Sequence, residues 1–124
     1  MQFLILIYND SEMLEAMPAS EFDRTMRDCL VHADELRAEG KLRDSMQLEA
    51  PSTARTVRTR NGRTSVVDGP FAETKEMLGG FNLIEAHDMD EAVRIATGFP
   101  WASSGSIEVR AVRDLDAVRQ RVGA

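Results

Sequence analysis

The chain has a single cysteine, Cys29, and aromatic side chains make up only 6% of its 124 residues. One cysteine cannot form an intramolecular disulfide, so nothing in the sequence indicates an oxidising compartment. No apolar run approaches the roughly 20 residues that a membrane-spanning helix needs, and the run Phe3–Ile7 lacks the basic lead-in of a signal peptide. These absences predict a soluble, cytoplasmic protein that does not contact a membrane.

Positive charge is also scarce, because 15 Lys and Arg residues stand against 21 Asp and Glu residues and the net charge is −6. A nucleic-acid surface needs clustered basic side chains to neutralise phosphates, so we expect no nucleic-acid partner. The one local basic cluster consists of Arg55, Arg58, Arg60 and Arg63. It flanks a predicted hairpin turn, where charged side chains discourage the pairing of strand edges.

Several kinds of reactive site lack their sequence signatures. The two histidines, His32 and His87, offer no metal-ligand spacing, and the acidic residues show no calcium-loop pattern. No serine stands in a nucleophile elbow. The pair Gly79-Gly80 opens a predicted strand rather than a helix, so it does not form a phosphate-binding loop. We therefore expect neither a metal site nor a cofactor.

What the sequence does have is the composition of one globular domain spanning residues 1–124, with 43% hydrophobic and 29% charged residues. Strands are predicted at residues 2–8, 42–48, 56–60, 64–67, 80–86 and 106–112. Asn61-Gly62 predicts a two-residue hairpin turn. A long amphipathic helix is predicted from a cap at Ser20 to Gly40, and a second helix follows a cap at Asp88. A terminal helix at Asp114–Val122 is expected to turn its apolar side chains toward the core.

This order of elements predicts an α+β fold with helices on one face of an antiparallel sheet. The first strand, QFLILIY (Gln2–Tyr8), is nevertheless apolar on both of its faces. The sheet face away from the helices would therefore expose an apolar patch of a size that monomers avoid. A second copy of the chain is the simplest cover, so we expect a homodimer.

The segment Asp68–Phe71 (DGPF) admits two interpretations. In the structural one, the Asp68 carboxylate accepts hydrogen bonds from backbone N–H groups just beyond it and fixes a turn, while Phe71 is buried as an anchor. In the functional one, Asp68 is a general base or a ligand-orienting group, with Glu73 and Lys75 nearby in the sequence as ligand-binding residues. The sequence leaves both interpretations open.

Residue parity in two strands suggests a second set of site residues. In SIEVRAV, Glu108 and Arg110 share one face, and in GFNLIEA the polar Asn82 lies opposite the face of Leu83. If the polar faces point into a barrel, Asn82, Glu108 and Arg110 line a pocket of polar groups among apolar walls, which is typical of a small-molecule site. The alternative is that these side chains face solvent or pair across strands.

Four segments are informative together: the string VVDGPFAETKE, the GGF that follows it, the Asp-rich start of the second helix and the closing SIEVRAV. In combination they resemble the DGPF-type branch of the YCII-related domain family. The resemblance extends from the first strand to about Val112. It implies a ferredoxin-like α+β fold that pairs sheet to sheet as a dimeric α+β barrel. Similar folds include lactone isomerases and dehydrochlorinases of small ring compounds, and some relatives resemble partners of sigma factors.

Better-studied YCII branches use a histidine on the first helix together with an aspartate that precedes a proline. The matching positions here are Cys29 and Phe99-Pro100, so that pair of groups is absent, and His32, about one helical turn from Cys29, is the candidate substitute. One hypothesis is a small-molecule enzyme in which Asp68, His32 and Glu108 supply acid–base chemistry. The other is a non-catalytic module that binds a small molecule or a protein, with a sigma factor as the partner that the resemblance suggests.

Overall fold

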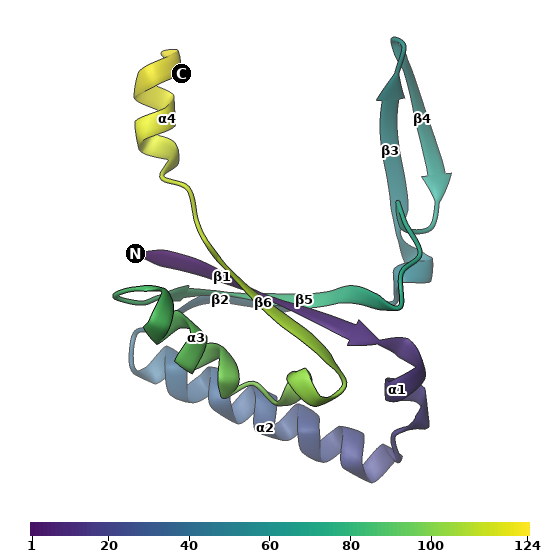
Figure 1. Cartoon of the computed structure of the whole chain (residues 1–124), viewed down its shortest axis with the longest axis vertical. Helices are drawn as coiled ribbons and strands as arrows, with labels where there is room; N and C mark the ends of the chain where they lie inside the picture. The colour runs from purple at the N-terminus through teal and green to yellow at the C-terminus, as the bar shows by residue number, and fades with distance from the viewer.

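The computed structural model describes residues 1–124 as a four-stranded antiparallel sheet with helices packed on one face (Figure 1). The strands are β1 (Gln2–Asp10), β2 (Leu42–Gln47), β3 (Arg55–Arg60), β4 (Arg63–Asp68), β5 (Glu76–Glu85) and β6 (Gly105–Ala111). The helices are α1 (Ser11–Ala16), α2 (Ala19–Ala38), α3 (Met89–Thr97) and α4 (Leu115–Val122), with the short 3-10 helices η1 (Pro51–Thr53) and η2 (Pro100–Ser103). The sheet order β2-β5-β1-β6 is that of a ferredoxin-like fold, which confirms the predicted α+β class.

Strand β1 lies in the middle of the sheet, between β5 and β6, and its alternate residues define the two faces. Phe3, Ile5 and Ile7 are buried against the helices. Leu4 and Leu6 point to the opposite face and are only partly covered. In one chain, therefore, a single face of β1 is fully packed, and the face away from the helices is open.

Helices α2 and α3 each supply three buried residues to the helical side of the core: Cys29, Ala33 and Leu36 from α2, and Ala92, Ile95 and Ala96 from α3. The prediction that Ser20 caps α2 is wrong, because α2 begins at Ala19 and the N-cap position is occupied by Pro18. The Pro18 carbonyl accepts the first N–H groups of the helix, so no side-chain cap is formed there.

The other predicted helix signals are confirmed. Gly40 follows the last turn of α2 with φ +74°, a conformation that glycine adopts without strain. The Asp88 carboxylate accepts a hydrogen bond of 2.9 Å from the N–H of Glu91 and caps α3. One short helix, α1, follows β1 directly, because the buried Asp10 accepts from the N–H groups of Glu12 and Met13.

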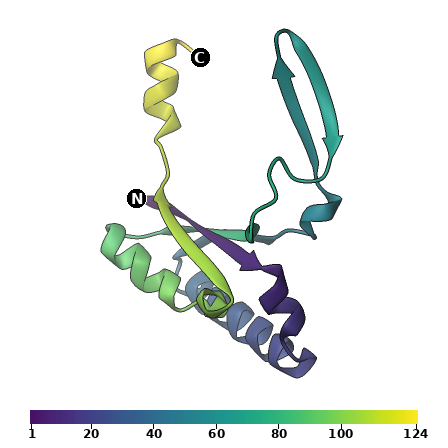
Figure 2. The same cartoon turned by 45° about the vertical axis from the view of Figure 1, so that its right-hand side comes forward.

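Two elements stand apart from the sheet, on the side that no helix covers (Figures 1 and 2). One is the hairpin of β3 and β4, whose turn residues Asn61 and Gly62 have φ of 52° and 76°, as expected for the predicted hairpin. The other is α4. Its predicted inward packing is wrong, since no residue of α4 is buried and Leu115 and Val122 are exposed. No other element lies against this helix to receive its apolar side. None of the helices has the length and hydropathy to span a membrane.

Candidate functional site

A cavity of about 470 Å³ lies between α2 and the β1-β5-β2 part of the sheet. Helix α2 contributes Phe22, Met26 and Cys29 to its wall, and Trp101 of η2 closes one side. The rings of Phe22 and Trp101 lie 5.9 Å apart at 51°, a tilted aromatic pair. The volume falls within the range of roughly 300–1,000 Å³ that is usual for small-molecule pockets.

Asn82 on β5 gives this cavity its most distinctive polar group. The residue is only 3% exposed, and its Oδ1 accepts a hydrogen bond of 2.6 Å from the Oγ of Ser45 on β2. The amide nitrogen, Nδ2, donates to no acceptor in the chain, and it is not sealed off from the cavity that Asn82 lines. A buried amide normally finds partners for its N–H groups, so this one is available to a ligand.

The pair Gly79-Gly80 shapes the same region by leaving out side chains. A Cβ at Gly80 would lie 2.7 Å from the carbonyl oxygen of Met46 on β2, and a Cβ at Gly79 would collide with the carboxamide of Asn9. Glycines thus let β2 approach β5 and let Asn9 fold against the sheet beside the cavity. The Oδ1 of Asn9 is buried without a partner.

The walls of the cavity carry no charge. None of the lining residues is Asp, Glu, Lys, Arg or His, and the one titratable group is the thiol of Cys29. Burial raises the pKa of Cys29 above its ordinary value of 9.0, although a hydrogen bond with the Trp101 side chain opposes this shift. The thiol is therefore protonated at neutral pH, and the cavity suits an uncharged molecule.

His32, a predicted catalytic residue, lies outside the cavity, where α2 meets α3. Its Nε2 is 3.0 Å from the carbonyl oxygen of Ile95, and since that oxygen can only accept, Nε2 carries the proton. The imidazole also packs edge-on against Phe99, with ring centroids 4.6 Å apart. In this arrangement His32 joins the two helices.

Glu108 and Arg110 lie on the open face of the sheet, and Asn82 lies on the opposite face. The register places Glu108 and Arg110 beside Leu6 and Leu4, whereas Asn82 is opposite Ile5. The three residues therefore do not line one pocket. The parity argument assigned Glu108 and Arg110 to a common face correctly but could not tell which face of β5 meets the helices.

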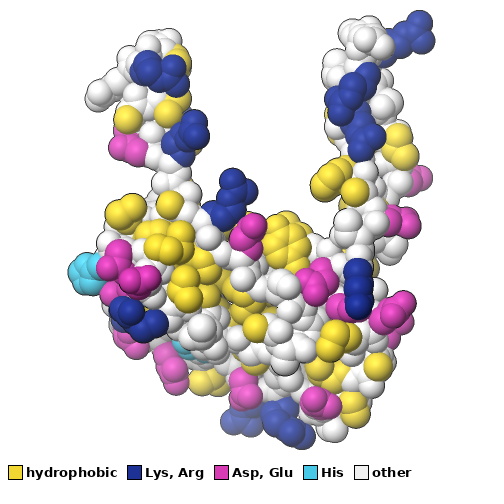
Figure 3. Space-filling model, in the orientation of Figure 1, with side chains coloured by type: hydrophobic (Ala, Val, Ile, Leu, Met, Phe, Trp, Pro, Cys, Tyr) yellow, Lys and Arg dark blue, Asp and Glu magenta, His cyan; other side chains and the backbone are white.

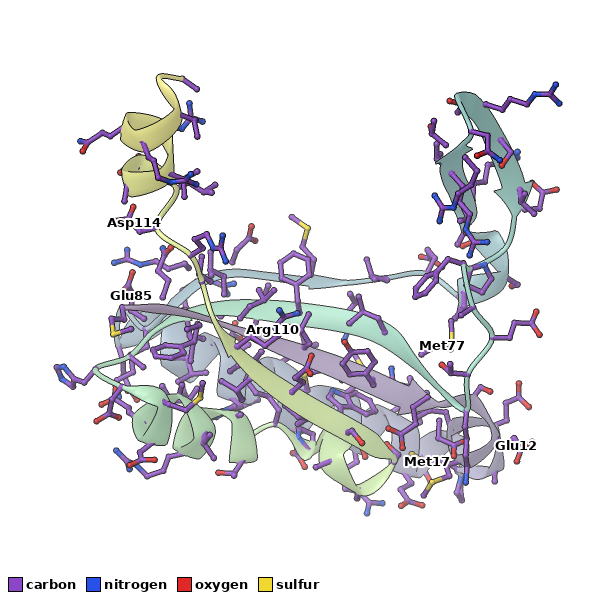
Figure 4. All side chains as sticks on the ribbon, turned by 45° about the horizontal axis from the view of Figure 1, so that its top comes forward. Glu12, Met17, Met77, Glu85, Arg110 and Asp114 are labelled. Atoms are coloured by element: carbon purple, nitrogen blue, oxygen red, sulfur yellow. The ribbon has the colours of Figure 1, made fainter.

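Apolar and polar groups are mixed on this open face. Figure 4 looks obliquely onto it and labels Arg110 on β6. The hydroxyl of Tyr8 donates to Oε1 of Glu108 at 3.4 Å. The apolar members on the same face are Leu4, Leu6, Phe81 and Leu83.

The DGPF corner differs from its predicted structure. Phe71 was expected to be buried, but it is 76% exposed because the corner follows the free-standing hairpin on the way to β5 and does not pass over the core. Asp68 caps no backbone group. Its carboxylate instead pairs with Arg55 across the hairpin at 3.1 Å, with 86% of the side chain exposed. Gly69 does have the expected positive φ, +95°.

The two remaining predicted residues lie near this corner and far from Asn82. Lys75 reaches the buried Asp10 with an Nζ–Oδ2 distance of 3.8 Å. Glu73 is exposed and makes no side-chain contact with a partner. Within the described chain no group of three His, Cys, Asp or Glu side chains could hold a metal ion.

Sequence reasoning missed Ser45, Phe22 and Trp101 as site residues. Ser45 sits in a short polar strand whose pairing with β5 shows only in three dimensions. Trp101 is the only tryptophan in the chain, and that rarity was a usable signal. Trp101 follows a proline and belongs to no predicted helix or strand, so hydrophobic periodicity alone did not assign it to the wall of the cavity.

The chain is thus a ferredoxin-like α+β domain with an uncharged cavity between helix α2 and the sheet. The YCII-related domain matches residues 1–116, and the chain belongs to this family. A relative in Rhizobium meliloti (strain 1021), the uncharacterized protein R00369, is 41% identical over 112 residues, which cover 89% of this chain and 90% of that protein.

A solved structure with the same fold is that of a dehydrochlorinase. The 5-chloro-2-hydroxyhydroquinone dehydrochlorinase TftG of Burkholderia phenoliruptrix AC1100, in complex with 2,5-dihydroxybenzoquinone, aligns with a TM-score of 0.55 at 18% identity. The alignment covers 91% of this chain and 94% of TftG. At this identity the likeness concerns the fold.

Proposed function

We propose that this protein binds a small, uncharged and largely apolar molecule in the cavity between α2 and the sheet. The observation that carries the proposal is Asn82, a buried residue of the cavity wall whose amide nitrogen has no acceptor in the chain and is not sealed off from the cavity. Water can satisfy this donor when no ligand is bound, and a ligand acceptor that takes the place of the water keeps the donor hydrogen-bonded. The ligand therefore combines an apolar body with a carbonyl or similar acceptor directed at Asn82.

The proposed activity is binding rather than acid–base catalysis at this cavity. General acid–base chemistry needs a group whose pKa lies near the working pH. Cys29 is the only titratable residue in the wall, and burial moves its pKa away from neutrality. The tilted rings of Phe22 and Trp101 offer aromatic contacts to a ring-shaped ligand.

The test uses the fluorescence of Trp101, which is the only tryptophan and lines the cavity. Two bicyclic probes differ in one group: 1-indanone carries a carbonyl and indane does not. Wild type is expected to bind 1-indanone more tightly, and Asn82→Leu is expected to lose that preference. Ser45→Ala is the matched control, because it removes the other partner of the Asn82 bond and keeps the Nδ2 donor.

The outcomes are distinct. If neither probe changes the Trp101 signal, or if Asn82→Leu keeps the preference for 1-indanone, the proposal is wrong. Near-ultraviolet circular dichroism of Asn82→Leu and Ser45→Ala checks that the core is intact in both variants. A preference that survives in Ser45→Ala and disappears in Asn82→Leu supports the proposal.

We also propose that two copies pair through the open face of the sheet. Leu4, Leu6, Phe81 and Leu83 lie on that face, and apolar side chains gather there between the hairpin and α4 (Figure 3). Monomers rarely leave a large apolar patch uncovered. A two-fold pairing of such faces would enclose the sheet surface between two copies.

A second candidate function follows from this pairing. The hydroxyl of Tyr8 lies 3.4 Å from Glu108, and Arg110 follows on the same face of β6. If a second copy excludes water from this group, a carboxylate beside a phenol and a guanidinium could perform acid–base chemistry on a small molecule. Glu108→Gln would then abolish turnover without affecting binding of 1-indanone. An association with a sigma factor stays a prediction from the family resemblance.

A further inference from the structure

The hairpin of β3 and β4 packs against little of its own chain. It forms a separate two-stranded sheet, no residue of β4 is covered, and only Thr56 of β3 is partly covered. Its links to the body lie at the base, where the Gly69 N–H donates to the Ala54 carbonyl and Thr56 donates to the Gly69 carbonyl. An isolated two-stranded hairpin is at best marginally stable in water, so this one needs another surface.

The two faces of the hairpin have different chemistry. On one face Val57 and Val66 stand directly opposite each other, with 66% and 60% of their surface exposed. The charges on that face are paired, because Arg55 binds Asp68 at 3.1 Å, and Thr59 and Thr64 share a hydrogen bond. The other face carries Arg58, Arg60 and Arg63. The valine face is thus apolar and electrically neutral, as a docking surface requires.

Charge distinguishes the hairpin from the rest of the chain. Residues 55–68 hold four arginines and one aspartate, or +3, and since the whole chain carries −6, the other residues carry −9. Figure 3 shows Lys and Arg side chains along the hairpin, with others on α4 and on the body, whereas Asp and Glu lie mostly on the body. A cationic arm on an acidic body is complementary to the body of a second copy.

Geometry also places a second copy within reach. The hairpin rises from the open side of the sheet and away from its own helices (Figures 1 and 2). Six residues of strand span about 20 Å, and two packed sheets lie about 10 Å apart. A hairpin of this length therefore extends past a sheet that covers the open face and along the side of the partner's body.

We propose that the β3–β4 hairpin is an arm that binds the body of a second copy of this chain through its Val57–Val66 face. This inference rests on the proposed pairing of sheet faces and adds a second contact to it. The arginines of the other face remain at the rim, where they attract the acidic partner and keep the hairpin soluble.

The test measures the dimer dissociation constant by sedimentation equilibrium on the full chain. In one variant an Asn-Gly turn replaces residues 55–68, which is feasible because Ala54 and Gly69 are joined by a hydrogen bond of 2.7 Å. In the second, Val57→Thr and Val66→Thr keep the shape and the strand propensity. Both variants are expected to raise the dimer dissociation constant by about tenfold or more. Val67→Thr, on the arginine face, is the matched control and is expected to change the dissociation constant by less than about threefold.

The outcomes separate this proposal from the sheet pairing. A wild-type chain that stays monomeric overturns both. A dimer whose dissociation constant is unchanged in the hairpin-replaced variant overturns the arm alone and leaves the sheet pairing standing. Equal weakening by Val67→Thr and by the Val57→Thr, Val66→Thr pair overturns the assignment of the valine face. Binding of 1-indanone, whose site contains no hairpin residue, is expected to stay unchanged in every variant.

Discussion

The imidazole of His32 lies directly against Gly98, in contact with the position that a Cβ on that residue would occupy. The contact explains why the residue after α3 has no side chain, since Gly98 has an ordinary αR conformation that other residues also adopt. His32 and Gly98 thus form one packing unit where the end of α3 meets α2.

This unit gives the first prediction. Gly98→Ala is expected to destabilise the fold by about 1–3 kcal/mol, because the added methyl group pushes the ring out of its contacts with Ile95 and Phe99. The double variant Gly98→Ala, His32→Ala also removes the ring. Its loss of unfolding free energy should be smaller than the sum of the losses in the two single variants. Urea denaturation of the four proteins completes the cycle, with His87→Ala at an exposed site as control. Strict additivity would show that the two residues do not share a contact.

The second prediction concerns the reactivity of Cys29. Its raised pKa and burial keep the thiol protonated and covered, so it should react with a disulfide reagent at least about tenfold more slowly than an exposed cysteine at pH 7.5. The matched comparison is Ser52→Cys in a Cys29→Ser background, since Ser52 is exposed. Equal rates for the two thiols would contradict the burial of Cys29.

The direction of the pH effect follows from the same shift. The pKa of Cys29 is higher in the folded chain than its ordinary value of 9.0, so the folded state favours the protonated thiol. Its contribution to stability is complete below pH 9 and is lost as the pH rises through the folded-state pKa. Cys29→Ser should therefore show a smaller loss of melting temperature above pH 9 than wild type does.

Much of the fold could be predicted because it depends on local rules. Gly40, Asp88 and the Asn61-Gly62 turn each act through their own backbone conformation or a hydrogen bond to a neighbour. The alternation in β1 likewise encodes two faces. These signals operate within a few residues, so a linear sequence contains them in full.

The predictions that failed concern which part of the chain packs against a given side chain or helix. Phe71 and the apolar side of α4 are hydrophobic, but no element of the same chain covers them. The face of Asn82 is set by the register of β5 with β1, and its partner Ser45 by the pairing of β5 with β2. In the structural interpretation Asp68 accepts from the backbone, but its carboxylate pairs with Arg55 because the hairpin register brings the two residues together. Such partners depend on how distant segments pack in three dimensions, and composition and periodicity contain no information about that packing.

The third prediction tests the corner at Asp68. Since its ion pair with Arg55 is exposed, Asp68→Ala and Asp68→Asn should each change the local stability of the hairpin by less than about 1 kcal/mol. Gly69→Ala should cost more, because φ is +95° at that residue. Amide hydrogen exchange in β3 and β4 is the suitable measurement, as the hairpin contributes nothing to the core. A larger effect for Asp68→Ala than for Gly69→Ala would restore the turn-fixing role.

The fourth prediction tests the open face of the sheet. Wild type should sediment at about twice the chain mass of 13.8 kDa at low micromolar concentration. Leu6→Asp places a charge on the face that the pairing would bury and should give a monomer. Leu30→Asp is the control, since Leu30 is exposed on the helical side. A dimer that tolerates Leu6→Asp would show that the contact lies elsewhere.

The central position of β1 also has a consequence for how the chain acquires its structure. Both neighbours of β1 come late: β5 begins at Glu76 and β6 at Gly105. The strand made first is therefore hydrogen-bonded last, and most contacts of the sheet span a large part of the chain. High contact order of this kind slows folding, because loop-closure entropy is lost before the long-range contacts form. During synthesis the apolar segment Phe3–Ile7 is therefore made well before β5 and β6, and it stays without its strand partners until those two segments follow.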